Sequence, residues 1–186
     1  QRAATAGVLS LQAWYGGQLR PGLEVVLIAL PIYHVAALAV GCLLGWAIGA
    51  RLVLVANPRD LPALVRDFVR ERPTVFGGVT TLYDALLRAP GIEQVDFSRL
   101  RLSMEGGAAL HRATAQRWLE RTGCTLLESY GLSETCGAIT GNPPGRDNPP
   151  GSIGQPLPGA EVRICDDEGR DRPPGEVGGV SATVGD

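Results

Sequence analysis

Four residues in one short stretch have chemistry suited to binding a nucleotide phosphate and a metal ion. Tyr130, Gly131, Ser133 and Glu134 follow the apolar run 125–127. A tyrosine ring can stack on a base, and a glycine lets backbone approach a ligand closely. A serine hydroxyl can donate to a phosphate oxygen, and a glutamate can bind a hard cation such as Mg²⁺. The stretch therefore indicates a nucleotide and metal site; the alternative is a solvated loop with an incidental tyrosine.

A second segment of small residues lies about one helix and one strand earlier. It joins an expected strand to an expected helix and consists of Gly106, Gly107 and Ala108. In open α/β sheets, ligands bind beyond the carboxyl ends of the strands, where small residues let backbone reach them. A glycine pair alone could equally be a turn that needs positive φ. Its position relative to Tyr130 predicts that both segments emerge from the same edge of one sheet.

The elements that would position these segments alternate between strand and helix. Expected strands lie at 24–30, 51–55, 74–76, 101–104 and 125–127. Helices are expected at 35–50, after the capping residue Asp60, at 80–88 and at 111–121. This alternation predicts an α/β fold with a mostly parallel sheet flanked by helices, followed by a short antiparallel β piece.

Composition shifts divide the chain into three parts. An α/β subdomain that carries the site is expected at 1–141, a Pro/Gly linker at 142–151 and a partial β subdomain at 152–186. In the last part, alternating residues predict a strand at 160–165 and a second strand that starts at 175.

Charge and composition argue against several classes of protein. The 186 residues carry a net charge of −2, and all 17 basic residues are arginines spread along the chain, so nucleic acid is a poor partner. Without lysine, the chain alone cannot complete chemistry that needs a lysine amine. The uncharged stretch 25–50 allows a membrane helix, but Pro31 and His34 interrupt it and its helical half is shorter than the roughly 20 residues of a span. We therefore expect no stable membrane insertion.

The four cysteines and two histidines do not form a zinc-binding pattern. Free thiols in a reducing cytoplasm are the expectation, although one disulfide stays open. The pair Arg99 and Arg101, like the pair Arg170 and Arg172, is expected to be solvated.

The stretch 128–135 resembles the Tyr-Gly-x-Thr/Ser-Glu signature of the adenylate-forming (AMP-binding) superfamily, which includes acyl-CoA synthetases, luciferases and peptide-synthetase adenylation domains. Other segments resemble that family in the same order, and together they cover about residues 5 to 178. They are 30–35, 74–83, 151–159 and 174–178, with Thr80 where proline is usual.

The resemblance implies a role for each candidate residue. Tyr130 would stack on adenine, with Gly131 beside it, Ser133 would contact phosphate and Glu134 would hold Mg²⁺. Ser133 and Glu134 would thus be the catalytic positions. The adenine and acyl pocket would be lined by Gly106, Gly107 and Ala108, and the acyl site would be bordered by His34, Val79, Ser129 and Leu132.

The implied activity is that of a fatty-acid–CoA ligase, which uses ATP to convert a carboxylic acid into an acyl-adenylate, releases pyrophosphate and transfers the acyl group to CoA. The alternatives are an enzyme that loads a carrier-protein thiol and a non-catalytic nucleotide-binding module. The family's phosphate loop and lysine-bearing carboxy-terminal domain are expected outside residues 1–186, so we expect an internal fragment that is inactive alone. The acid and the oligomeric state are not specified by these residues.

Overall fold

Parallel strands form most of a seven-stranded sheet in the computed structural model, which describes residues 2–146, 148–149 and 151–184. The strand order is β2-β1-β3-β4-β5-β6-β7. The first five strands in this order run parallel, whereas β6 pairs antiparallel with β5 and β7 pairs antiparallel with β6. The bounds are β1 Val25–Ile28, β2 Arg51–Leu54, β3 Val75–Gly78, β4 Leu102–Gly106, β5 Leu126–Leu132, β6 Gly137–Gly141 and β7 Gln155–Pro156. The predicted mostly parallel α/β architecture is confirmed.

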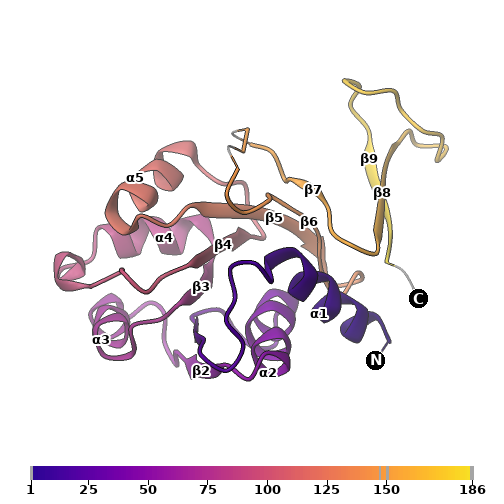
Figure 1. Cartoon of the computed structure of the whole chain (residues 1–186). Helices are drawn as coiled ribbons and strands as arrows, with labels where there is room; N and C mark the ends of the chain where they lie inside the picture. The colour runs from indigo at the N-terminus through magenta and orange to yellow at the C-terminus, as the bar shows by residue number, and fades with distance from the viewer. Residues whose placement is uncertain (1, 147, 150, 185–186) are drawn as a thin grey trace.

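Helices cover both faces of this sheet (Figure 1). One face packs against α3 (Leu61–Glu71), α4 (Thr80–Leu87) and α5 (Arg112–Thr122). The other face packs against α1 (Arg2–Tyr15), the π-helix η1 (Ala36–Leu43) and α2 (Leu44–Ala47), and a 3₁₀ turn, η2, spans Ile92–Gln94. Because side chains alternate along a strand, Val75 and Phe76 enter opposite cores, as expected for a sheet buried on both faces.

An aromatic cluster fills the core beneath α3, α4 and α5. The indole of Trp118 lies edge-on to Tyr83, with ring centroids 4.7 Å apart, and its Nε1 donates to Ser103 Oγ at 3.0 Å. Both aromatic side chains are fully buried. Edge-to-face packing adds about 1 kcal/mol per pair beyond the area buried. This core holds α4 and α5, whose amino ends face the candidate site.

Asp60 confirms the expected helix cap, since its Oδ1 accepts a hydrogen bond from the Ala63 amide at 3.0 Å. The helix expected at 35–50 differs from the prediction, because a π-helix is followed by a short α-helix. Its glycines pack closely against the sheet: a Cβ on Gly41 would lie 3.0 Å from Ile28, and one on Gly45 would lie 2.4 Å from Leu52. Among the described residues, no helix combines the length and apolar character that crossing a membrane requires.

The sheet differs from the sequence prediction at β5 and β7. β5 continues to Leu132 because its end pairs with β6 in an antiparallel hairpin, so Tyr130 and Gly131 lie in a strand and not in a loop. β7 joins the main sheet through pairing with β6, although its residues follow the expected linker. The division at 142–151 stays a prediction.

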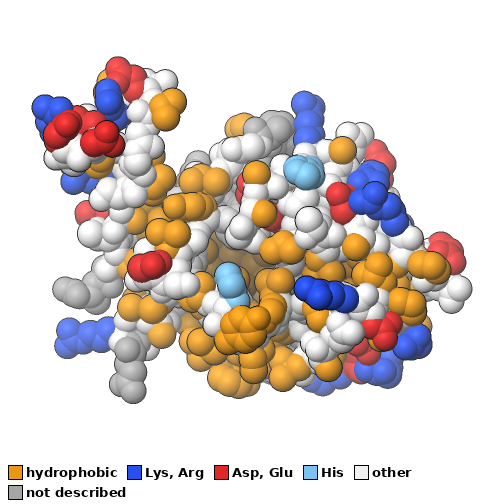
Figure 2. Space-filling model, turned by 180° about the vertical axis from the view of Figure 1, so that it is seen from behind, with side chains coloured by type: hydrophobic (Ala, Val, Ile, Leu, Met, Phe, Trp, Pro, Cys, Tyr) orange, Lys and Arg blue, Asp and Glu red, His pale blue; other side chains and the backbone are white. Residues whose placement is uncertain are grey.

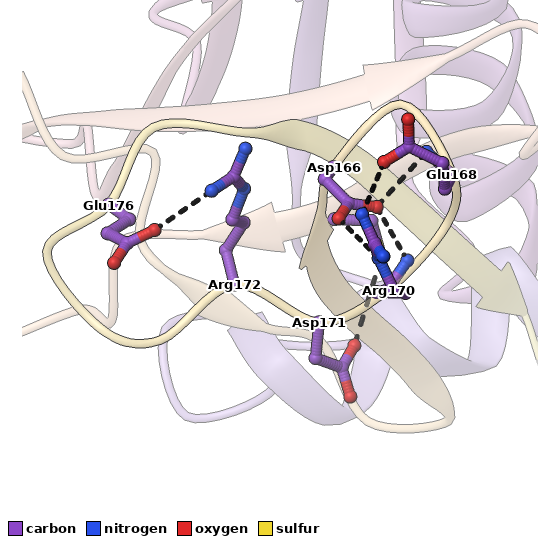
Figure 3. Close-up of polar contacts among 7 residues, drawn as sticks. Asp166, Glu168, Arg170, Asp171, Arg172 and Glu176 are labelled. Carbon is purple, nitrogen blue, oxygen red and sulfur yellow. Dashed lines mark hydrogen bonds and ion pairs between the residues drawn. The ribbon is translucent and has the colours of Figure 1, made fainter.

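The carboxy-terminal strands β8 (Ala160–Cys165) and β9 (Gly179–Val184) form a separate antiparallel sheet that projects from the main body (Figure 1). The second strand starts at 179, not at the expected 175. The loop that connects β8 to β9 carries ion pairs: Arg170 bonds Asp166 and Glu168, and Arg172 bonds Glu176 (Figure 3). Both arginines are exposed, as expected, and ion pairs made by exposed side chains contribute little to stability.

The expectation that the charge of Arg101 is solvated is wrong, because Arg101 pairs with Glu24. Its guanidinium bonds the buried carboxylate of Glu24, which also accepts the Arg20 amide at 2.6 Å and the Thr74 hydroxyl. Burial opposes ionisation, but these hydrogen bonds outweigh it and hold the pKa of Glu24 below its ordinary value. The group ties β1, β3 and β4 together at their amino ends, opposite the candidate site.

Replacing Arg101 with Met should lower the free energy of unfolding by about 3 kcal/mol, because it leaves a buried carboxylate without its cation. Urea titration at pH 7 measures the change. The neighbouring exposed Arg99→Met is the matched control and should stay within about 0.5 kcal/mol of the wild type. Equal effects of the two substitutions would contradict this role for the Glu24 ion pair.

Candidate active site

Parallel pairing of β4 and β5 brings the two candidate segments together. Gly106 is in register with Ser129, and the Ser129 hydroxyl donates to the Glu105 carbonyl at 3.0 Å. A Cβ on Gly106 would lie 3.2 Å from Ser129 Oγ, so the fit between the strands favours glycine. Since both strands end at the same edge of the sheet, segment 106–108 lies beside the residues that follow Ser129, as the sequence predicts.

Open space surrounds the turn of this segment. Gly107 has a φ of +87°, in the region that favours glycine, and a Cβ there would meet no atom within 4 Å. Gly107 and Ala108 are both exposed. The backbone of this turn is therefore accessible to a flat ligand.

Tyr130 is half-buried near the end of β5 and pairs with Thr140 on β6. The register shifts between Tyr130 and Gly131, and a Cβ on Gly131 would lie only 2.0 Å from the Gly137 carbonyl oxygen. Gly131 thus has a structural requirement, because β6 backbone occupies the space that a side chain would need. Its contact with a nucleotide stays a prediction.

Ser133 and Glu134 occupy the exposed turn between β5 and β6. The Thr135 hydroxyl fixes this turn: it accepts from the Leu132 amide at 3.1 Å and lies 2.9 Å from the Gly137 carbonyl. Within the described residues, no group of three His, Cys, Asp or Glu side chains could hold a metal. A single exposed carboxylate, Glu134, fits the mode in which Mg²⁺ takes one or two protein carboxylates together with substrate phosphates and water.

The candidate acyl-site residues lie along the same edge of the sheet. Val79 follows β3 directly and is half-buried, whereas Leu132 is exposed on the β5–β6 hairpin. His34 is exposed, and its Nδ1 accepts from the Ala36 amide at 3.2 Å. His34 therefore caps the start of η1; the structure gives no further contact of His34 with the other candidates.

An apolar cavity of about 60 Å³ lies between the sheet and the helices α1 and η1. Figure 2 shows a hollow with largely hydrophobic walls on this side of the molecule. Ser129 and Gly106 line the cavity, whereas His34, Val79 and Leu132 do not. Gly77 also lines it, and a Cβ on Gly77 would meet no atom within 4 Å, so this glycine leaves the cavity open.

A buried carboxyl group lies directly before the Gly106–Gly107 turn. Glu105 is 1% exposed; its Oε1 accepts from the Thr80 amide at 3.3 Å, and its Oε2 is buried without a partner. Burial, together with the nearby Glu128 carboxylate, raises the pKa of Glu105 to about 7, although the hydrogen bonds from Thr80 lower it. Glu105 is therefore partly protonated at neutral pH.

Sequence reasoning missed three features of this site. It assigned no role to Glu105 as a titratable group, although its place next to a glycine pair at a strand end was a usable signal. It also missed α1, whose Leu11 and Tyr15 line the cavity, although their helical spacing was visible. The extension of β5 through Tyr130 depends on pairing with β6, which short-range patterns do not reveal.

In the wild type, the free energy of unfolding should fall as Glu105 ionises with rising pH, and Glu105→Gln should abolish this fall. The raised pKa of Glu105 means that the folded state binds more protons than the unfolded state between about pH 4.3 and 7, so stability falls across that window. Glutamine stays neutral and should be more stable at pH 8, by at most about 3 kcal/mol. Urea titrations at pH 4.5, 6 and 8 measure this.

The control is Glu93→Gln, which changes an exposed glutamate and should leave the pH dependence intact. A Glu105→Gln curve that is parallel to the wild-type curve would contradict the raised pKa.

Comparisons with known proteins extend these observations. The sequence matches the family model described as AMP-binding enzyme over residues 1–182. It is 42% identical to the long-chain-fatty-acid–CoA ligase of Escherichia coli O157:H7 over 90% of the chain and 30% of that protein. It is 45% identical to the ligase of the same name from Yersinia pestis over 84% of the chain and 28% of that protein.

The fold matches the crystal structure of the anthranilate CoA ligase AuaEII in complex with anthranoyl-AMP, with a TM-score of 0.86 and 28% identity. The match covers 96% of this chain and 35% of that one. The chain thus spans about 30% of the length of the curated relatives it matches. The extent of the family match and the identity to these relatives show that the chain belongs to the AMP-binding enzyme family.

Proposed function

We propose that the protein containing this chain is an AMP-forming acyl-CoA ligase. The observation that carries the proposal is the register of β4 and β5, which puts the exposed turn of Gly107 beside Tyr130 and next to an apolar cavity. A flat aromatic beside accessible backbone suits an adenine, and an apolar cavity suits the hydrocarbon part of an acid. The names of the relatives support the same activity.

In the proposed reaction, the substrate carboxylate attacks the α-phosphorus of ATP, giving an acyl-adenylate and pyrophosphate. The sulfur of CoA then attacks the acyl carbon, and AMP leaves. This chain would supply positioning: Tyr130 and segment 106–108 orient adenine, and the Ser133 hydroxyl donates to phosphate. Glu134 would hold Mg²⁺, which neutralises phosphate charge when bound. Such a site accelerates the reaction by orientation and electrostatics, without a protein nucleophile.

The cavity favours an apolar acid. Its lining from β1, β3, η1 and α1 is mostly hydrocarbon, although Glu105 and Ser129 also line it, and Gly77 keeps it open. The curated relatives are named for long-chain fatty acids, whereas AuaEII is named for anthranilate, so the supported class is an aliphatic or aromatic acid.

The chain alone should not complete the reaction. It spans about 30% of the length of its curated relatives and contains no lysine, and the planar guanidinium of arginine does not reproduce the compact, flexibly held ammonium of lysine. Pyrophosphate release from ATP by the 186-residue chain, dependent on added acid, would overturn this expectation.

AMP should bind this chain, and Tyr130→Ala should weaken that binding about tenfold, because base stacking on an aromatic contributes roughly 1–3 kcal/mol. Isothermal titration calorimetry measures both affinities. Tyr33→Ala is the matched control, since Tyr33 is exposed outside the proposed adenine site, and it should bind AMP like the wild type. Absence of binding by the wild type would contradict the proposed nucleotide site.

Gly77→Leu should fill the cavity and weaken binding of hexanoate about tenfold, since excluding two methylenes costs about 1.6 kcal/mol. Calorimetry with hexanoate measures the loss, and unchanged AMP affinity shows that the sheet edge is intact. Gly17→Leu is the control because Gly17 is exposed with no atom near its Cβ position. Equal hexanoate affinity in all three proteins would rule out the cavity as the acyl site.

A further inference from the structure

One hydroxyl group contacts both ends of the exposed glycine segment. Residues 106–108 are flanked by Glu105 and Ala109, and Thr80 at the start of α4 lies next to both. Its Oγ1 is 3.2 Å from Glu105 Oε1 and 3.1 Å from the Ala109 carbonyl oxygen. The Thr80 amide also donates to Glu105 Oε1 at 3.3 Å. A single side chain on α4 therefore links the two ends of the segment.

Two side chains of β5 also bond the residues on either side of the segment. The Ser129 hydroxyl donates to the Glu105 carbonyl at 3.0 Å, and the Leu110 amide donates to Glu128 Oε1 at 3.3 Å. The segment thus has partners on α4 and β5 at both ends, although its own turn is exposed.

Burial makes these contacts strong constraints. Thr80 is 2% exposed, Glu105 is 1% exposed and Glu128 is 6% exposed. A buried polar group that loses its partner costs more than the hydrogen bond itself contributes. Among the residues that the structure describes, no arginine pairs with Glu105 or Glu128, and their hydrogen-bond donors are a hydroxyl and backbone amides. The Thr80 hydroxyl can donate to one end of the segment or share its hydrogen between both.

We propose that Thr80 is a positioning residue whose hydroxyl fixes the conformation of the Gly106–Ala108 turn before a nucleotide binds. The bracing of the turn rests on contacts within the chain. Its consequence for a nucleotide rests on the proposed function, because the turn is the proposed adenine contact. Preorganisation of this kind raises affinity by reducing the ordering cost of binding.

The test compares Thr80→Val, which removes the hydroxyl and keeps the volume, with Thr81→Val on the exposed position next to it. Thr80→Ser restores a hydroxyl. Hydrogen exchange followed by NMR reports on each amide in the chain without ligand. In Thr80→Val, the amide of Leu110, which donates to Glu128 and shares a peptide unit with the Ala109 carbonyl, should exchange about tenfold faster, whereas amides in α1 and α3 should keep their wild-type rates. Thr81→Val should match the wild type, and Thr80→Ser should lie closer to the wild type than Thr80→Val.

Unchanged exchange of the Leu110 amide in Thr80→Val would overturn the proposal. A uniform increase across α1, α3 and the turn would also overturn it, because it would mark Thr80 as a general stability residue. The dissociation constants of the same proteins for AMP test the effect on ligand binding. Thr80→Val should bind AMP severalfold more weakly than Thr81→Val. If the wild type binds no AMP, the proposed function fails, and the exchange rates alone decide whether Thr80 braces the turn.

Discussion

The parallel pairing of β4 with β5 is the constraint on which the candidate site depends. Residues 106–108 and 130–134 are separated in sequence by a helix, and only the register that aligns Gly106 with Ser129 brings them side by side. A shift of one residue would turn every side chain of β5 to the opposite face. The shift would leave a leucine in each core, but it would separate Glu128 from the Leu110 amide and Ser129 from the Glu105 carbonyl, so these hydrogen bonds fix the geometry of the site.

Buried polar groups secure the sheet at both ends. At the amino ends of the strands, Glu24 is neutralised by Arg101 and joins three strands. At the carboxyl ends, Glu105 and Glu128 have amide and hydroxyl partners but no described cation, and burial raises the pKa of Glu105. The two ends therefore differ: at the amino ends the Glu24 carboxylate is paired with Arg101, whereas at the carboxyl ends Glu105 remains a titratable group next to the exposed Gly107 turn.

Local signals in the sequence predicted much of the fold. Strand and helix periods identified the central alternation, and Asp60 marked the start of α3 as observed. The sequence did not reveal that β5 extends through Tyr130, because that extension requires pairing with β6. The solvated interpretation of Arg101 was wrong because its partner, Glu24, is distant in sequence. Gly131 was attributed to ligand approach, whereas the backbone of β6 gives it a structural requirement that only the folded hairpin shows.

Amide chemical shifts of the isotope-labelled chain during titration with AMP test most directly whether two segments form one nucleotide site. The amides of Gly106, Gly107 and Ala108 should shift together with those of Tyr130 and Gly131, and all of them should follow one dissociation constant. Shifts confined to one segment, two separate dissociation constants, or shifts only in β8 and β9 would contradict a single nucleotide site.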